Sequence, residues 1–179
     1  MLSWERMNLL VRKKQTGFTI VELLIVIVVI GILAAITIVA FNGVQQRARD
    51  AQRKQNLNDL ATALQTYYID NGNYVTTGAG AGNGQGWVNG GSPHLTHLLV
   101  SAGALNRADI RDPRCTAGEL AGCSGYLKIN CGSGSTQRTI LMARLESEPT
   151  GQPLPSELTG CSSTSYWTTY QMNYFVQVG

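Results

Sequence analysis

Proline, histidine and cysteine are scarce in this 179-residue sequence, and their positions limit what the chain can be. All five prolines come after residue 92, so no proline breaks a helix in the first half of the chain. There are only two histidines, His94 and His97, which is few for a catalytic or metal-binding set. The four cysteines lie beyond residue 110, and residues 23–41 contain no charge at all.

The uncharged stretch 23–41 has Thr37 as its only polar residue. As a helix rising about 1.5 Å per residue, it is roughly 28 Å long, which matches the hydrocarbon core of a bilayer. Glu22 stands directly before it. Because a charge in lipid costs a few kcal/mol, the position of Glu22 demands a specific reason.

The segment around this run resembles the N-terminal signal of type IV pilins and pseudopilins. In that family a short basic leader is followed by Gly, then an apolar residue, then Glu four residues on, within an apolar helix. Gly17, Phe18 and Glu22 stand at these offsets, and the close resemblance covers GFTIVELLIVIVVIGILAAI. The resemblance implies a class III signal peptide, with leader 1–17 removed by a membrane peptidase between Gly17 and Phe18 and the new amino terminus N-methylated at Phe18. The competing interpretation is an ordinary signal anchor that carries a glutamate.

The net charge of +3 belongs entirely to the leader, which holds four basic residues and Glu5. The other 10 basic and 10 acidic side chains balance, so bulk charge does not suggest a nucleic-acid binder. Four basic residues lie near each end of the apolar run, so the positive-inside rule does not decide its orientation. Cysteines in the C-terminal part favour an oxidising compartment for it, and the leader resemblance implies the same orientation.

Residues 18–72 are predicted to form one helix, in which 18–41 is a transmembrane or filament-core half and 42–72 an amphipathic half. Gly72 provides a stop suited to a left-handed cap. Apolar residues recur at three- and four-residue steps, and the charged residues lie mostly on other faces. The apolar set is Leu57, Leu60, Ala61, Leu64, Tyr67 and Tyr68; the charged set is Arg47, Arg49, Asp50, Arg53, Lys54 and Asp59.

Residues 73–179 are predicted to form a globular head, which begins with a glycine-rich loop at 76–91. A phosphate-binding loop is excluded because no Gly-Lys-Ser/Thr follows, and Trp87 is expected to pack onto the head. Ser92-Pro93 begins a short helix that Gly103 ends. Segments 126–130, 139–145 and 168–178 have strand composition. The predicted fold class is therefore α+β: a long N-terminal helix packed on a small antiparallel sheet of about three strands.

The cysteines Cys115, Cys123, Cys131 and Cys161 allow three disulfide pairings. Local spacing favours Cys115–Cys123 with Cys131–Cys161, whereas a simple meander would bring Cys161 nearer to Cys123. A zinc site is disfavoured because there is no close CxxC pair.

No metal, cofactor or catalytic site is expected. His94 and His97 are interpreted as part of a solvated helix face, because no third ligand lies near them in the sequence. Asp109 and Asp112 are interpreted as turn residues, since the rest of a calcium-ligand series is missing.

The leading hypothesis is a structural, non-enzymatic subunit of a type IV pilus-like surface filament. By resemblance, its partners are other copies of itself, the prepilin peptidase, and an assembly platform with its ATPase. The precursor would lie in the cytoplasmic membrane with its leader inside and its head outside, before export into an extracellular filament. Glu22 is expected to act in assembly by pairing with the Phe18 amino group of another copy.

Two alternatives remain open. One is a pseudopilin or minor pilin of a secretion or DNA-uptake system, and the other is a single-pass anchored binding module that works as a monomer. DNA binding is disfavoured, because the basic residues of the head, Arg107, Arg111 and Arg114, have acids between them.

Overall fold

A computed structural model describes residues 17–74, 85–89, 94–115, 125–132, 137–161 and 164–179. The chain divides into two units, Met1–Asn42 and Gly43–Gly179, and the second is called the C-terminal unit below. The leader up to residue 16, the proposed cap at Ser92 and Pro93, Cys123 and most of the glycine-rich loop lie outside the described residues.

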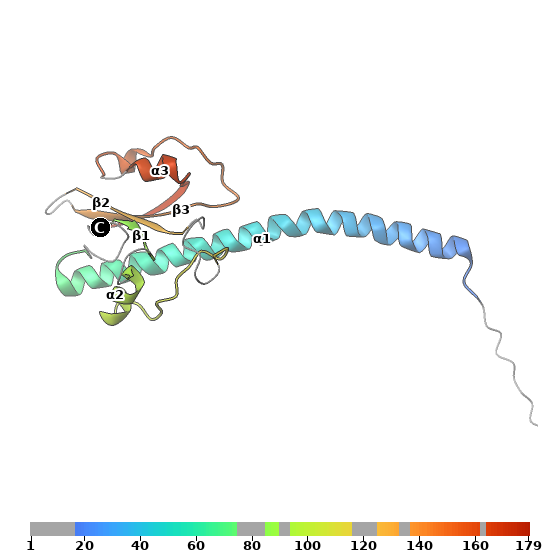
Figure 1. Cartoon of the computed structure of the whole chain (residues 1–179), viewed down its shortest axis with the longest axis horizontal. Helices are drawn as coiled ribbons and strands as arrows, with labels where there is room; N and C mark the ends of the chain where they lie inside the picture. The colour runs from blue at the N-terminus through green and yellow to red at the C-terminus, as the bar shows by residue number, and fades with distance from the viewer. Residues whose placement is uncertain (1–16, 75–84, 90–93, 116–124, 133–136, 162–163) are drawn as a thin grey trace, which may run out of the picture. The chain divides into compact units, whose positions relative to one another are not determined.

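Helix α1, Ile20–Asn71, is continuous along the chain (Figure 1). It ends as the sequence predicts: Gly72 has a φ of 72°, and its N–H donates to the carbonyl of Tyr68 over 2.8 Å. Every side chain at 23–41 is exposed in the isolated chain. Among the described residues, α1 is the helix whose length and composition suffice to cross a membrane.

The C-terminal unit contains a four-stranded antiparallel sheet in the order β1-β2-β3-β4. The strands are β1 Gly86–Trp87, β2 Leu127–Cys131, β3 Arg138–Ala143 and β4 Tyr174–Val178. The predicted α+β class and meander are confirmed. The two-residue β1 was not predicted, because it falls in glycine-rich sequence without strand composition; it pairs Trp87 with Leu127.

The predicted strand at 168–178 is wrong in its first half. Helix α3, Ser165–Thr169, ends within that part, a turn follows it, and β4 begins only at Tyr174. The helix is closed by two bonds, from the Gln171 N–H to Thr168 O and from the Met172 N–H to Trp167 O. Strand β3 also ends two residues early, because the Leu145 N–H leaves the ladder and donates to Asn173 Oδ1 over 2.7 Å.

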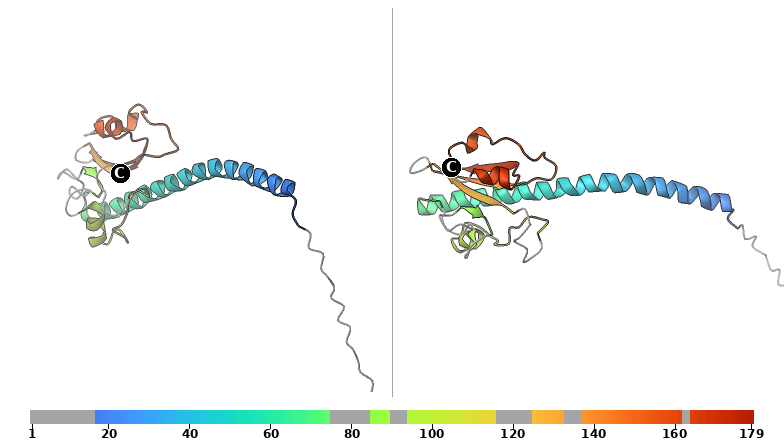
Figure 2. Two further views of the ribbon diagram at one scale, coloured as in Figure 1. Left: turned by 45° about the vertical axis from the view of Figure 1, so that its right-hand side comes forward. Right: turned by 45° about the horizontal axis from the view of Figure 1, so that its top comes forward.

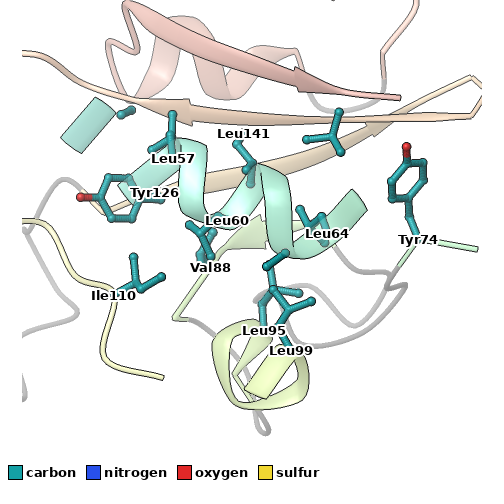
Figure 3. Close-up of a cluster of buried hydrophobic side chains, with 13 residues drawn as sticks. Leu57, Leu60, Leu64, Tyr74, Val88, Leu95, Leu99, Ile110, Tyr126 and Leu141 are labelled. Carbon is teal, nitrogen blue, oxygen red and sulfur yellow. The ribbon is translucent and has the colours of Figure 1, made fainter. Parts of the chain in front are cut away.

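The alternation of side chains along β2 and β3 gives the sheet two faces, each with its own cover. On one face, Leu57, Leu60 and Leu64 of α1 pack with Leu141 of β3, as predicted (Figure 3). On the other face, Ile129 and Ile140 pack under Trp167 of α3. Figure 2 shows α1 and α3 on opposite sides of the sheet.

Helix α2, Leu95–Ser101, packs Leu95 and Leu99 into the first of these clusters. Its start is flanked by His94, whose side chain makes no capping bond. Its end is the predicted Gly103, which has a φ of 73° and allows the Ala104 N–H to reach back to Leu99 O over 2.9 Å.

Trp87 packs in the C-terminal unit as expected. It lies against the second cluster and makes an edge-on ring contact with Tyr170, with the ring centroids 4.9 Å apart.

Candidate functional site

Glu22 lies in the first turn of α1 and is bound to Thr19, the residue before the helix. The Thr19 N–H and hydroxyl both donate to Glu22 Oε2 over 2.9 Å, and the Glu22 N–H donates to Thr19 Oγ1 over 3.2 Å. This reciprocal arrangement is a capping box, in which each side chain satisfies a backbone N–H that the helix leaves unpaired.

Thr19 was missed by the sequence reasoning. The signal was present, because Thr-x-x-Glu before an apolar run is the sequence form of a capping box. Glu22 thus has a local reason to lie beside the apolar run, in addition to any partner in an assembly.

Gly17 and Phe18 lie directly before this cap and are open to solvent. Phe18 is 80% exposed, and no other atom lies within 4 Å of the position that a side chain on Gly17 would occupy. The peptide between them is accessible, and helix α1 begins two residues after Phe18, at Ile20.

Arg53 of α1 forms a second organised cluster, within the C-terminal unit. Its side chain is only 2% exposed and contacts three carboxylates. Nε and Nη2 donate to the two oxygens of Asp112 over 2.6 and 2.9 Å. Nη1 lies 2.7 Å from Asp50 Oδ1 and 2.8 Å from Glu146 Oε1. The guanidinium therefore joins α1 to the segments before β2 and after β3.

Asp50 strengthens this cluster by accepting two backbone hydrogen bonds. The N–H groups of Glu146 and Ser147 donate to Oδ1 and Oδ2 over 2.9 and 2.8 Å. Burial alone would raise the pKa of Asp50, but these bonds and Arg53 lower its pKa below the ordinary value.

Glu146 is held mainly by Arg49, whose Nε and Nη2 donate to its two oxygens over 2.8 and 2.6 Å. This bidentate contact from Arg49, together with Arg53, lowers the pKa of Glu146 to about 2 against the effect of burial. Glu146 thus stays ionised and paired over the whole neutral and mildly acidic range.

These contacts correct two sequence interpretations. Asp50 and Arg53 are buried, not on a solvent face, and Asp112 is 2% exposed and pairs with Arg53 besides accepting the Arg114 N–H of its own turn. The apolar periodicity of α1 did not reveal the burial of Asp50 and Arg53. Periodicity identifies a core face by its apolar residues, and here charged residues occupy part of that face. The i,i+3 spacing of Asp50 and Arg53 was the available local signal.

A polar side chain continues the cluster one turn further along α1. Asn56 donates to the Tyr126 hydroxyl over 2.7 Å and accepts from Arg107 over 2.9 Å. Burial raises the pKa of Tyr126 to about 12, so the hydroxyl keeps its proton. Arg107, Arg111 and Arg114, the candidate basic cluster, each lie beside an acid: Asp59, Asp109 and Glu146.

Cys131, at the end of β2, forms a disulfide with Cys161. This is the pairing that local spacing favours, and the two residues also form an antiparallel bridge. Cys115 is in a disulfide as well, but the proposed partner Cys123 lies outside the described residues.

His94 and His97 lie with their ring centroids 5.5 Å apart. Within the described parts of the chain, no group of three or more His, Cys, Asp or Glu side chains is arranged to hold a metal ion.

The N-terminal part of the chain is similar to a known sequence motif and to several known proteins. Residues 12–38 match the model of the prokaryotic N-terminal methylation motif. The type II secretion system core protein G of Aeromonas hydrophila is 35% identical over 69 residues, which is 38% of this chain and 48% of that protein. The type IV major pilin PilA of Myxococcus xanthus is 41% identical over 61 residues, 34% of this chain and 28% of that protein.

A longer match is the fimbrial protein EcpC of Eikenella corrodens, 34% identical over 97 residues, 54% of this chain and 61% of that protein. The chain spans about half the length of the secretion-system relatives that it matches. No solved structure matches the chain.

Proposed function

The N-terminal segment of this chain is that of the type IV pilin and pseudopilin family, and from it we propose that the chain is a structural subunit of a type IV pilus-like surface filament. The observation that carries the proposal is the N-terminal motif itself: Gly17 and Phe18 exposed before a capped helix whose next 19 side chains, 23–41, are apolar or small and all exposed. A surface of this kind requires cover by lipid or by other helices.

We propose that the membrane covers this surface first. In the precursor, residues 23–41 span the cytoplasmic membrane, leader 1–17 lies inside, and residues 73–179 lie outside. A prepilin peptidase cleaves after Gly17, and the new amino group of Phe18 is methylated. The leader carries the whole positive excess of the chain, so its removal leaves a neutral subunit.

In the assembled state, the apolar half of α1 packs against the helices of other copies, with a platform and ATPase driving the transfer. Glu22 then lies near the Phe18 amino group of a neighbouring copy. Two opposite charges away from water are tolerable when paired and costly when either stands alone, so the pair fixes the register of the subunits.

A pseudopilin of a secretion system is the second candidate. It is favoured by the names of several relatives, which are type II secretion system core protein G from different bacteria. The motif in 12–38 serves either role, and the segments of the head lie largely beyond it.

The test is N-terminal sequencing of the exported protein, combined with electron microscopy of material sheared from the cell surface. We expect a chain beginning at Phe18 within helical filaments. An intact Met1 terminus on a monomeric membrane protein would refute the filament and favour the anchored binding module. Processed chains in short filaments that never reach the cell surface would favour the pseudopilin.

A further inference from the structure

Strand β4 forms one edge of the sheet, because β3 is its only partner in the order β1-β2-β3-β4. In an antiparallel strand, every second residue points its N–H and C=O to the same side, so at least two of the five residues of β4 point theirs away from β3. Among the described residues, no other element forms a backbone hydrogen bond with them. The outer edge of β4 is therefore open to pairing with a further strand.

This edge lacks the features by which proteins usually prevent edge pairing. The sequence of β4, Tyr-Phe-Val-Gln-Val, contains neither a charge nor a proline. The surrounding sequence is also neutral, because no residue from 158 to 179 is charged. The opposite edge is different: β1 has only two residues, and a very short edge strand is one such protection. Of the two edges, β4 is thus the one suited to a partner.

A pocket of about 570 Å³ lies beside the start of β4, between the strand and residues 148–155 of the loop that leads from β3 to α3 (Figure 1). Tyr174 and Phe175 both line this pocket. Neighbouring residues of a strand point to opposite faces of the sheet, so a pocket that both of them line reaches the strand edge between them. Its volume is in the range of ligand-binding pockets.

The loop wall of the pocket is held in place but cannot complete the sheet. Asn173 Nδ2 donates to Glu148 O over 3.1 Å, and Trp167 Nε1 donates to Gln152 O over 3.0 Å. These two bonds fix the loop next to β4. Three prolines line the pocket from the loop: Pro149, Pro153 and Pro155. Because a proline has no N–H with which to pair with a strand, the pocket stays open, with a free strand edge on one side and apolar rings on the other.

Glu148 is the one charged residue that lines the pocket. Its side chain is exposed. The carboxylates that form ion pairs among the described residues are others, namely Asp50, Asp59, Asp109, Asp112 and Glu146. A ligand that carries a lysine or arginine would therefore find a carboxylate not already paired with a cation of the described chain.

From these features we propose that the edge of β4 and the adjoining pocket bind an extended peptide segment of a partner protein. The main chain of the peptide pairs with β4 as a fifth strand, a large apolar side chain occupies the pocket, and a lysine or arginine beside it meets Glu148. A compact apolar ligand could fill the pocket but would leave the backbone groups of β4 unpaired. The proposal goes beyond the filament and does not depend on it, because it concerns the C-terminal unit alone.

The experiment measures peptide binding to the full-length chain in detergent micelles, with protein-free micelles as the blank. The probes are capped peptides of the form Thr-Lys-Val-x-Val-Lys-Thr, in which x is Leu, Phe, Tyr or Trp and the lysines share one face with x. We expect at least one of them to bind with a Kd below about 100 μM. The same peptide methylated on its backbone nitrogens should bind roughly tenfold more weakly, because it cannot pair as a strand.

Glu148→Lys tests the charge without disturbing the pocket, since the carbonyl of this residue, and not its side chain, accepts from Asn173. The variant should bind the lysine peptides roughly fivefold more weakly, and it should bind peptides with glutamate in place of lysine more tightly than the unmodified chain does. Asp70→Lys is the matched control, which should leave both affinities unchanged. It makes the same charge change at an exposed position about 24 Å along α1 from Lys54, whose ammonium lies over the ring of Tyr174.

Hydrogen exchange separates strand pairing from binding through side chains alone. The bound peptide should slow amide exchange within Tyr174–Val178 by about tenfold and leave α2 unchanged.

Four results would overturn the proposal: no peptide of the set binding at about 1 mM, methylated peptides binding equally well, Glu148→Lys behaving like Asp70→Lys, or binding without protection of the β4 amides. If these amides are already protected in the free chain and lose that protection on dilution, a second copy occupies the edge and the proposal is wrong.

Discussion

Arg53 and Asp112 stand 59 positions apart in the sequence and are joined by two parallel hydrogen bonds of 2.6 and 2.9 Å. Both side chains are 2% exposed. The pair connects the amphipathic half of α1 to the turn before β2, and Asp50 and Glu146 extend it to the segment after β3. The second half of α1 is thus held in the C-terminal unit by ions as well as by the leucines beside them.

Replacing Arg53 by leucine should destabilise the C-terminal unit strongly. The change leaves Asp50 and Asp112 buried without their cation, and removing one partner of a buried pair costs about 3–5 kcal/mol. The measurement is thermal unfolding of the processed chain in detergent, together with protease resistance. Arg47→Leu is the matched control on the same helix, and it should change stability by less than about 0.5 kcal/mol because Arg47 is exposed. Equal stability of the two variants would show that the cluster contributes nothing.

Acid should weaken the same cluster within a defined pH window. The pKa of Glu146 falls from an ordinary 4.5 to about 2 on folding, mainly through Arg49. Between these values the unfolded chain binds a proton that the folded chain does not, so stability is full above about pH 4.5 and is lost as the pH falls toward 2. We expect the unfolding temperature to drop by roughly 5 °C more in the unmodified chain than in Glu146→Gln, whose stability at neutral pH is already lower. Parallel pH profiles of the two proteins would contradict this assignment.

Gln171 stands in the left-handed region, with a φ of 53°, at the position after α3 that glycine favours. Its side chain is exposed and makes no hydrogen bond recorded among the described residues. Gln171→Gly should therefore stabilise the C-terminal unit by about 0.5–1 kcal/mol, because the strain of a Cβ in this conformation is removed. Chemical denaturation of the variant, compared with Gln171→Ala as a control that keeps the Cβ, measures the effect. A glycine variant less stable than the alanine variant would contradict it.

The sequence predicts the parts of this fold that follow from local periodicity. The apolar run, the leucine stripe at Leu57, Leu60 and Leu64 and the helix stop at Gly72 are all readable because each depends on neighbours within a few residues. Strands β2 and β3 were recognisable by composition for the same reason.

The parts that the sequence did not predict depend on distant partners. Asp112 appears as an ordinary turn residue until the fold brings Arg53 beside it, and the strand β1 exists only because β2 pairs with it. The end of helix α3, Thr168 and Thr169, was mistaken for strand because threonine is typical of strands, while the position of this helix is set by packing of Trp167 on Ile129 and Ile140. The capping box at Thr19 was a local signal, and it was overlooked.

Glu22 has two possible roles, a local one as the partner of Thr19 in the capping box and a proposed one as the partner of the Phe18 amino group in a filament. Three variants separate them. Glu22→Gln keeps a side chain that can complete the capping box but removes the charge. Thr19→Ala keeps the charge but removes the cap, at a cost of about 1 kcal/mol confined to the first turn of a 52-residue helix. Glu22→Ala removes both.

If the charge directs assembly, Glu22→Gln and Glu22→Ala should both lower filament yield at least tenfold, and Thr19→Ala should stay within about threefold of the unmodified chain. All three should still be cleaved after Gly17, because none changes the two residues at the cut. The measurements are the mass of the processed chain and the amount of sheared filament from equal numbers of cells. Normal assembly of Glu22→Gln combined with failure of Thr19→Ala would reverse the assignment, because it would mean that the neighbouring copy requires a well-formed helix start and not a carboxylate.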